Sequence, residues 1–175
     1  LTAGLALGTV EALSASLFYL LHSTLIAAGL FLLVDMIARQ RGDKRDALSA
    51  GSKLMQPSLL GGLFFLAAIA VAGLPPLSGF LGKLLLLQAV SGVQALQLWP
   101  ILLIGGLVTL VALSRAGSVL FWKAGRHIHD RANSDIWRTL VCCGLLGASI
   151  ALVLGAAPIL AYTQATARQL LDLAP

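Results

Sequence analysis

Two ionisable residues inside long apolar stretches of this 175-residue chain are the side chains best suited to chemistry. Lys83 lies within GFLGKLLLLQAV, and His22 lies within YLLHSTLIA. Removing an ammonium group from water disfavours its charged form, which would let Lys83 exchange protons. Histidine is the side chain whose unperturbed pKa lies nearest physiological pH. These residue types predict proton transfer.

Each residue also has an ordinary structural interpretation. Lys83 could reach an interface with its long side chain or hold an ion pair. The first option is awkward, because four leucines follow it and the apolar stretch continues to about Val90. His22 could form a hydrogen bond between helices. Ser23 and Thr24 adjoin it and could bond backbone carbonyls or water.

The apolar stretch that holds Lys83, residues 57–90, is expected to contain a helix break. As one helix it would reach roughly 50 Å, whereas the hydrocarbon core of a bilayer is about 30 Å thick. A break over 73–79 is predicted because prolines remove helix hydrogen bonds; its residues are Gly73, Pro75, Pro76 and Gly79. Broken backbone at membrane depth must be buried in protein or line a watery cavity. A broken span with a buried cation is typical of ion-translocating proteins.

Three further charged residues lie near the ends of apolar stretches. Arg115 cannot release its proton in practice, so we expect an ion pair or a fixed positive field. Asp35 precedes Arg39 by four residues and is expected to pair with it. Glu11 begins an apolar stretch and suits the start of a helix. All three are interpreted as supporting residues.

The composition predicts an integral membrane protein that is entirely α-helical. Hydrophobic residues make up 58% of the chain, charged residues 11%, and the mean hydropathy is +0.93. A soluble domain has a very different balance. The net charge of +5 does not indicate nucleic-acid binding, because the basic residues lie in short gaps between apolar stretches. The partner implied is the lipid bilayer.

Four membrane spans and the tail of an earlier helix, residues 1–8, are predicted as parts of one domain. The spans cover about 12–38, 57–90, 98–122 and 139–162. Nine of the twelve Lys and Arg residues lie in the loops 39–56 and 123–138, whereas the connection 91–98 is uncharged. Both basic loops should therefore lie on the cytoplasmic face of the cell membrane. The chain begins inside an apolar stretch, so we expect a fragment of a longer protein.

The sequence contains no motif for phosphate binding, nucleophilic catalysis or metal binding. A phosphate-binding glycine loop, a nucleophile elbow and a Cys/His metal pattern are all absent from it. The two adjacent cysteines, Cys142 and Cys143, are expected to serve packing. We therefore expect a protein that is not an enzyme and has no cofactor or metal site.

Four segments carry a resemblance to a known family. They are GLPPLSGFLGK (73–83), LFYLLHSTLIAAGLFLLVD (17–35), ARQRGD (38–43) and LSRAGSVLFWK (113–123). The first resembles the antiporter-like membrane subunits shared by respiratory complex I and the multisubunit cation/proton antiporters. The other three favour the D subunit of the Mrp (Mnh, Pha) type of antiporter.

The resemblance implies a fold and roles for the two central residues. Such subunits have fourteen helices in two inverted five-helix repeats, each with a half-channel. By this resemblance, Lys83 is the lysine of the broken twelfth helix and His22 the histidine of the eleventh. Some relatives have a second histidine or a lysine near the HST element, where this chain has Phe18 and Ile26.

The expected function is that of one component in a secondary antiporter that exchanges Na⁺ or K⁺ for protons. Lys83 would carry the exchangeable charge, His22 would relay protons through water, and the partners would be other subunits of the same complex. One alternative is a proton-pumping membrane component of a complex I-like NADH:quinone oxidoreductase. A second alternative is a structural membrane component in which Lys83 only holds an ion pair.

Overall fold

The computed structural model describes residues 2–41, 48–49, 54–122 and 136–172, and the described residues form helices and short connections without any strand. The helices are α1 (Thr2–Leu7), α2 (Val10–Gln40), α3 (Pro57–Ala72), α4 (Ser78–Gln88), α5 (Gly92–Gly117) with a π-helical end η2 (Ser118–Trp122), α6 (Ile136–Leu154) and α7 (Ala156–Asp172).

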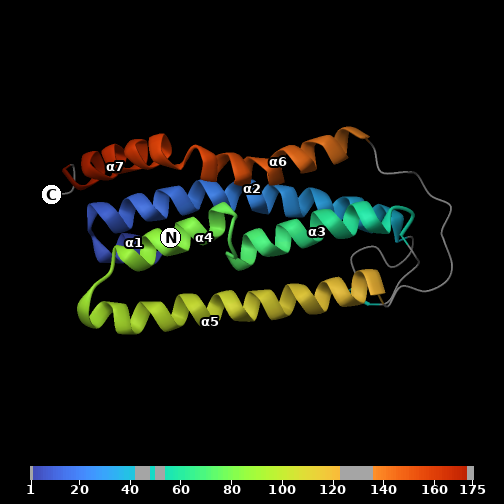
Figure 1. Ribbon diagram of the computed structural model, residues 1–175, viewed down its shortest axis with the longest axis horizontal. Coiled ribbons are helices and arrows are strands. Elements are labelled where there is room, and N and C mark those ends of the chain that lie inside the picture. Colours follow the sequence, from blue (N-terminus) through green and yellow to red (C-terminus); the bar gives the residue numbers. More distant parts are fainter. Residues whose placement is uncertain (1, 42–47, 50–53, 123–135, 173–175) are drawn as a thin grey trace.

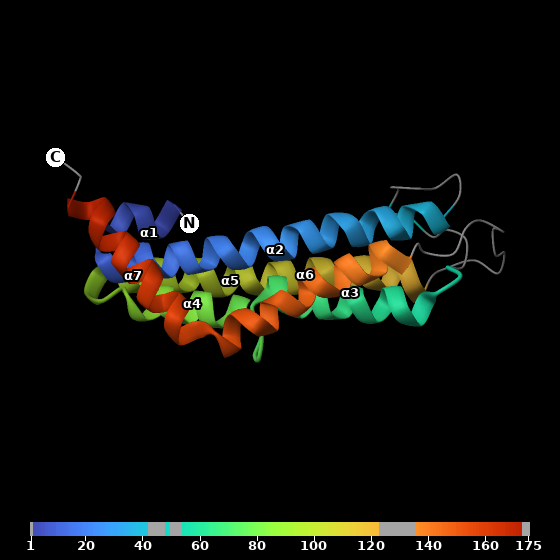
Figure 2. The same cartoon turned by 90° about the horizontal axis from the view of Figure 1, so that it is seen from above.

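The helices form an elongated bundle around α2 (Figures 1 and 2). Helix α2 runs almost the full length and contacts α1, α3, α4, α6 and α7. Helices α6 and α7 follow one another along one side of it, and α3 and α4 follow one another along another side. Helix α5 lies outermost and packs mainly against α3. Helix α2 is therefore the central element of the bundle, whereas α5 packs against α3 and α4 on the outside.

The predicted break in the 57–90 span is present and lies between α3 and α4. Gly73 ends α3 with φ +76°, a left-handed conformation that glycine adopts without steric cost. The amide of Leu74 donates to the Ile69 carbonyl at 3.1 Å, which closes the last turn of α3. The irregular segment is shorter than the predicted 73–79, because α4 begins at Ser78 and Gly79 is already helical.

The last predicted span differs in extent from the structure. Instead of one segment ending near Tyr162, two helices cover 136–154 and 156–172, with a bend at Gly155 that is visible in Figure 2. Pro158 has no amide hydrogen to donate to the Leu154 carbonyl, so the helix loses a bond where it bends. Helix α7 thus continues ten residues beyond the predicted end of the span, to Asp172.

Three of the described helical stretches are long and apolar enough to cross a membrane: Val10–Gln40, Gly92–Trp122 and Ile136–Leu154. Helix α3 is apolar too but shorter. Helix α5 starts at Gly92, so most of the connection predicted at 91–98 is helical. The ends of α2, α3, η2 and α6 that border the two basic loops all lie at one end of the bundle (Figure 1), as expected for loops on one face.

The core is a contact between α2, α3 and α6. Leu33 and Met36 of α2 and Leu60 of α3 are fully buried, and Leu146 of α6 packs against them. Gly29 allows α6 to approach closely, because an added Cβ would lie 3.1 Å from the Leu146 side chain. Small residues at such contacts are typical of helix packing in membranes.

Candidate functional site

His22 is buried at the centre of the bundle in a chain of hydroxyl groups. Its side chain is only 2% exposed. Its Nδ1 lies 2.8 Å from Ser78 Oγ, and Ser78 Oγ lies 2.7 Å from Ser149 Oγ. These residues come from α2, α4 and α6, so one polar network joins three helices. Buried polar groups that are satisfied in this way help to fix one packing arrangement.

The break between α3 and α4 also positions Lys83. Its ammonium donates a 2.7 Å hydrogen bond to the carbonyl of Ala72, the last residue of α3. The last carbonyls of a helix lack partners within the helix and carry partial negative charge, so they favour a cation. In an unbroken helix the Ala72 carbonyl would accept a hydrogen bond from a later backbone amide of the same helix. The break leaves this carbonyl available to Lys83.

Glycines make room for the lysine side chain. An added Cβ at Gly73 would lie 2.8 Å from Lys83 Nζ, and one at Gly106 of α5 would lie 3.3 Å from it. A cavity of about 270 Å³ lies beside Lys83 between α4 and α5, and its other described lining residues are uncharged. The ammonium therefore sits at the edge of an otherwise apolar cavity, with the Ala72 carbonyl as its acceptor.

The other face of the break approaches His22. A Cβ at Gly79 would lie 2.2 Å from the Ala70 carbonyl oxygen and 2.8 Å from His22 Nε2. The imidazole thus has its Nε2 next to a carbonyl near the end of α3 and its Nδ1 next to Ser78. Both candidate residues, Lys83 and His22, therefore contact the same helix break.

The two hydroxyl residues next to His22 do not join this network. Ser23 Oγ donates to the Leu20 carbonyl at 3.1 Å, and Thr24 Oγ1 donates to the Leu20 and Leu21 carbonyls at 3.0 Å. These are local bonds within α2, the backbone option that the sequence left open. The structure does not bring Ser23 and Thr24 to His22 as supporting groups.

The predicted contact between Asp35 and Arg39 is present, with a distance of 2.9 Å between Nε and Oδ2. Arg138 of α6 also binds the Asp35 carboxylate, a contact that the sequence did not suggest. Arg115 is exposed on α5 and forms no ion pair with another residue in the described part of the chain. The ion pair expected for Arg115 is thus not seen there.

Glu11 lies in the first turn of α2, where Thr9 Oγ1 accepts a hydrogen bond from the Ala12 amide at 3.2 Å and caps the helix. With Gln88 of α4 and Gln164 of α7 it lines a cavity of about 160 Å³. This cavity lies near the end of α4, away from the basic loops. His127 and His129, which belong to a basic loop of the sequence, lie outside the described residues.

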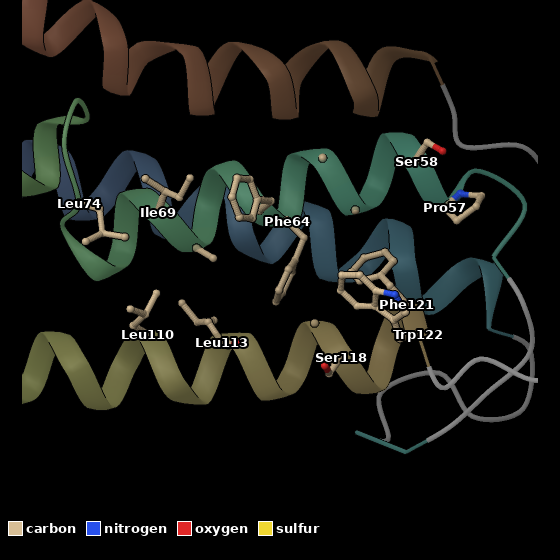
Figure 3. A pocket seen from close by; sticks show the side chains of 16 residues that line it. Pro57, Ser58, Phe64, Ile69, Leu74, Leu110, Leu113, Ser118, Phe121 and Trp122 are labelled. Atoms are coloured by element: carbon tan, nitrogen blue, oxygen red, sulfur yellow. The ribbon is translucent and has the colours of Figure 1, made fainter.

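A larger cavity, about 630 Å³, is apolar and lies between α3 and α5. Figure 3 shows Ile69 and Leu74 on the α3 side facing Leu110 and Leu113 of α5. None of its 16 lining residues is ionisable. It therefore adds volume beside the helix break but no group that could carry a proton.

Three contributors to the site, Ser78, Ser149 and Gly106, were not predicted from the sequence. Ser78 follows the proline pair closely, so its position at the start of the second half-helix could have indicated a polar group beside the break. Ser149 stands alone in the apolar sequence ASIALV, and only the packing of α6 against α2 and α4 reveals its partner. Among the described residues no group of three or more His, Cys, Asp or Glu side chains could hold a metal ion.

Comparison with known proteins finds a family match over residues 1–109, described as NADH:quinone oxidoreductase/Mrp antiporter, transmembrane. The D subunit of the Na⁺/H⁺ antiporter of Alkalihalophilus pseudofirmus is 31% identical over 97% of this chain and 34% of that protein. The D subunit of a probable K⁺/H⁺ antiporter of Rhizobium meliloti is 32% identical over 98% of this chain and 37% of that protein.

A component of a different kind of complex is also similar. The N subunit of the NADH-quinone oxidoreductase of Erythrobacter litoralis is 37% identical over 67% of this chain and 22% of that protein. The chain thus spans about a third of the length of the two antiporter proteins and less of the oxidoreductase protein. The family match covers more than half of the residues, and the described residues form apolar helices of membrane length. The chain therefore belongs to the NADH:quinone oxidoreductase/Mrp antiporter transmembrane family and is a multi-pass membrane protein.

Proposed function

We propose that this chain is part of the D subunit of a multisubunit antiporter that exchanges Na⁺ or K⁺ for protons across a bacterial plasma membrane. The proposal rests on the two antiporter relatives, which align with nearly the whole chain. In this proposal the chain contributes one half-channel, other subunits of the complex are its partners, and the loops 39–56 and 123–138 face the cytoplasm.

One observation supports the proposal above all others. The helix break brings a lysine and a histidine to the same point, with the Ala72 carbonyl on the ammonium and the Ala70 carbonyl beside the imidazole. The last carbonyls of α3 stabilise positive charge at this point, so they hold a proton until another cation or proton acceptor competes for it. Discontinuous helices whose ends face the transported ion are a general feature of secondary transporters.

The proposed mechanism assigns separate tasks to the two residues. Lys83 binds and releases a proton at the edge of the cavity between α4 and α5, whose volume of about 270 Å³ is large enough to hold water. His22 passes protons between this region and the interior of the bundle. Asp35 and Glu11 lie toward opposite ends of α2 and act as supporting charges rather than as carriers.

Replacement of Lys83 tests the proposal in the assembled complex. Lys83→Ala should abolish cation-dependent proton flux in membrane vesicles while the subunits still assemble. Lys83→Arg should also lose most of the flux, because a guanidinium group stays protonated and cannot release the proton during the cycle. The flux is normalised to the amount of assembled complex.

The structural alternative predicts a different result for the arginine variant. If Lys83 only holds the Ala72 carbonyl, any fixed cation can keep that contact. Near-normal flux in Lys83→Arg would overturn the proton-exchange role and leave the residue as a fixed charge. Loss of assembly in Lys83→Ala alone, with a functional arginine variant, would support the same structural conclusion.

The second candidate function is that of a proton-pumping component in a complex I-like oxidoreductase, which the similarity to the Erythrobacter litoralis protein favours. The two functions differ in what drives proton movement. An antiporter responds to an imposed Na⁺ or K⁺ gradient, whereas a pump responds to NADH and quinone. Proton flux that requires quinone reduction and ignores both cations would reject the antiporter function.

A further inference from the structure

The hydroxyl chain that ends at His22 carries an inference about Ser149. This serine lies in an apolar part of α6, is 1% exposed, and bonds Ser78 at 2.7 Å. Ser78 is completely buried and bonds His22 Nδ1 at 2.8 Å. A helical serine can satisfy its hydroxyl on the backbone of its own helix. A buried pair of hydroxyls that instead reaches a titratable ring on another helix therefore calls for an explanation.

The direction of the hydrogen bonds follows from the groups around the ring. His22 Nε2 lies beside the Ala70 carbonyl, which favours a hydrogen on this nitrogen. A carbonyl oxygen can only accept, so Nε2 carries the hydrogen and Nδ1 of the neutral ring is a bare acceptor. Ser78 must then donate to Nδ1, and its oxygen is free to accept from Ser149. The neutral state thus has one consistent order of donors, from Ser149 through Ser78 to His22.

Protonation of the ring reverses this order. The protonated imidazole donates from both nitrogens, so Ser78 Oγ becomes the acceptor and must turn its own hydrogen toward Ser149. Ser149 then donates elsewhere, and the carbonyl four residues earlier in its own helix is the usual acceptor for a helical serine. Thr163, another buried hydroxyl residue, makes a similar local bond to the carbonyl three residues earlier, that of Leu160, at 3.1 Å.

We propose that Ser149 is a positioning residue that acts through Ser78: it fixes the Nε2-protonated form of neutral His22 and supplies the acceptor that the protonated ring needs. The inference rests on the proposed role of His22 in proton relay. The two hydroxyls serve both protonation states by rotation alone, so neither helix has to move. Ser149 therefore controls how readily His22 takes up a proton.

Other groups near the ring do not duplicate this role. Lys83 of α4 is the charged neighbour, and Tyr19 of α2 itself contributes an aromatic ring at 5.5 Å. Helix α3 has no ionisable side chain. On α6, Cys142 contacts Gly29 and Arg138 contacts Asp35, both farther along α2 than His22. Ser149 is the residue of α6 that forms a hydrogen bond with Ser78 and so joins the His22 network.

The test is the pH profile of cation-dependent proton flux by the assembled complex in vesicles. In Ser149→Ala, the protonated ring donates to Ser78, and the Ser78 hydroxyl hydrogen then has no Ser149 oxygen as its acceptor. The neutral ring is unaffected, because Ser78 still donates to Nδ1. The charged form of His22 should be harder to reach, so the profile should move toward lower pH by roughly half to one unit. Ser149→Thr retains a hydroxyl and should restore the wild-type profile.

Thr163→Val is the matched control. Thr163 shares a buried 2.8 Å hydroxyl contact with Ser14 between α2 and α7, about two helical turns along α2 from His22. Loss of this contact removes one buried interhelical bond of the same kind but leaves the contacts of His22 intact, so the pH profile should not shift. Equal profiles for the wild type, Ser149→Ala and Thr163→Val would overturn the inference, as would an equal shift in both variants.

His22→Ala separates the inference from the proposed function. If His22→Ala changes the profile and Ser149→Ala does not, the positioning role of Ser149 is wrong and the relay role of His22 stands. If His22→Ala leaves rate and profile unchanged, the relay itself is wrong, and the inference about Ser149 is overturned with it.

Discussion

His22 and Lys83 show how the same helix break provides two different environments. The imidazole is sealed among hydroxyls and a carbonyl, whereas the ammonium lies at the edge of a cavity of about 270 Å³. A sealed group can exchange protons only through its hydrogen-bond partners. A group beside a cavity of this size can exchange protons with water once water enters the cavity. In the proposed relay, the two residues therefore take consecutive steps of one transfer rather than the same step.

At the level of single residues, His22→Ala should slow exchange and change its pH profile. The substitution removes the titratable ring and leaves Ser78 without its Nδ1 partner. Proton flux is measured across a range of pH in vesicles that contain equal amounts of complex. A complex that assembles and keeps its wild-type rate and profile would reduce His22 to a packing residue.

At the level of elements, the approach of α4 to the end of α3 depends on Gly79. A Cβ at this position would lie 2.2 Å from the Ala70 carbonyl oxygen, a backbone atom that cannot move without disturbing α3. Gly79→Ala should therefore destabilise the break by about 1–3 kcal/mol, as overpacking generally does. The thermal stability of the purified complex and its proton flux should both fall.

Gly62→Ala on α3 is the control for this prediction. Nothing lies within 4 Å of a Cβ placed at Gly62, so the extra methyl group should be tolerated. If Gly79→Ala is as stable and active as Gly62→Ala, then the close contact between α4 and α3 is not a requirement of the site.

The elements also show what could be predicted from the sequence. Apolar length located α2, α3 and α5, and the proline pair located the break, because both effects act locally along the chain. The hydroxyl network could not be predicted, because Ser149 meets Ser78 only when α6 packs against α4 across 71 positions of sequence. The bend at Gly155 was missed because the apolar stretch around it has no polar interruption, although Pro158 was a local signal for it.

At the level of the whole molecule, the orientation of the bundle is a separate prediction. The loops 39–56 and 123–138 hold most of the basic residues and are expected to be cytoplasmic. In a cysteine-free background, Gly42→Cys and Asn133→Cys should react with a membrane-impermeant reagent from the cytoplasmic side. Gln94→Cys, which is at an exposed position of α5, should react from the outside. Labelling of positions 42 and 133 from opposite sides would contradict the arrangement of spans.

The break lies near the middle of the bundle's length (Figure 1), and in the proposed function this position determines how the membrane potential acts on transport. A charge that crosses the entire membrane gains or loses about 2.3 kcal/mol per 100 mV. A proton or cation that reaches Lys83 from one end crosses only part of that field, and it crosses the remainder when it leaves. The electrical work is thus divided between two steps, so neither barrier changes with voltage as steeply as a single full crossing would.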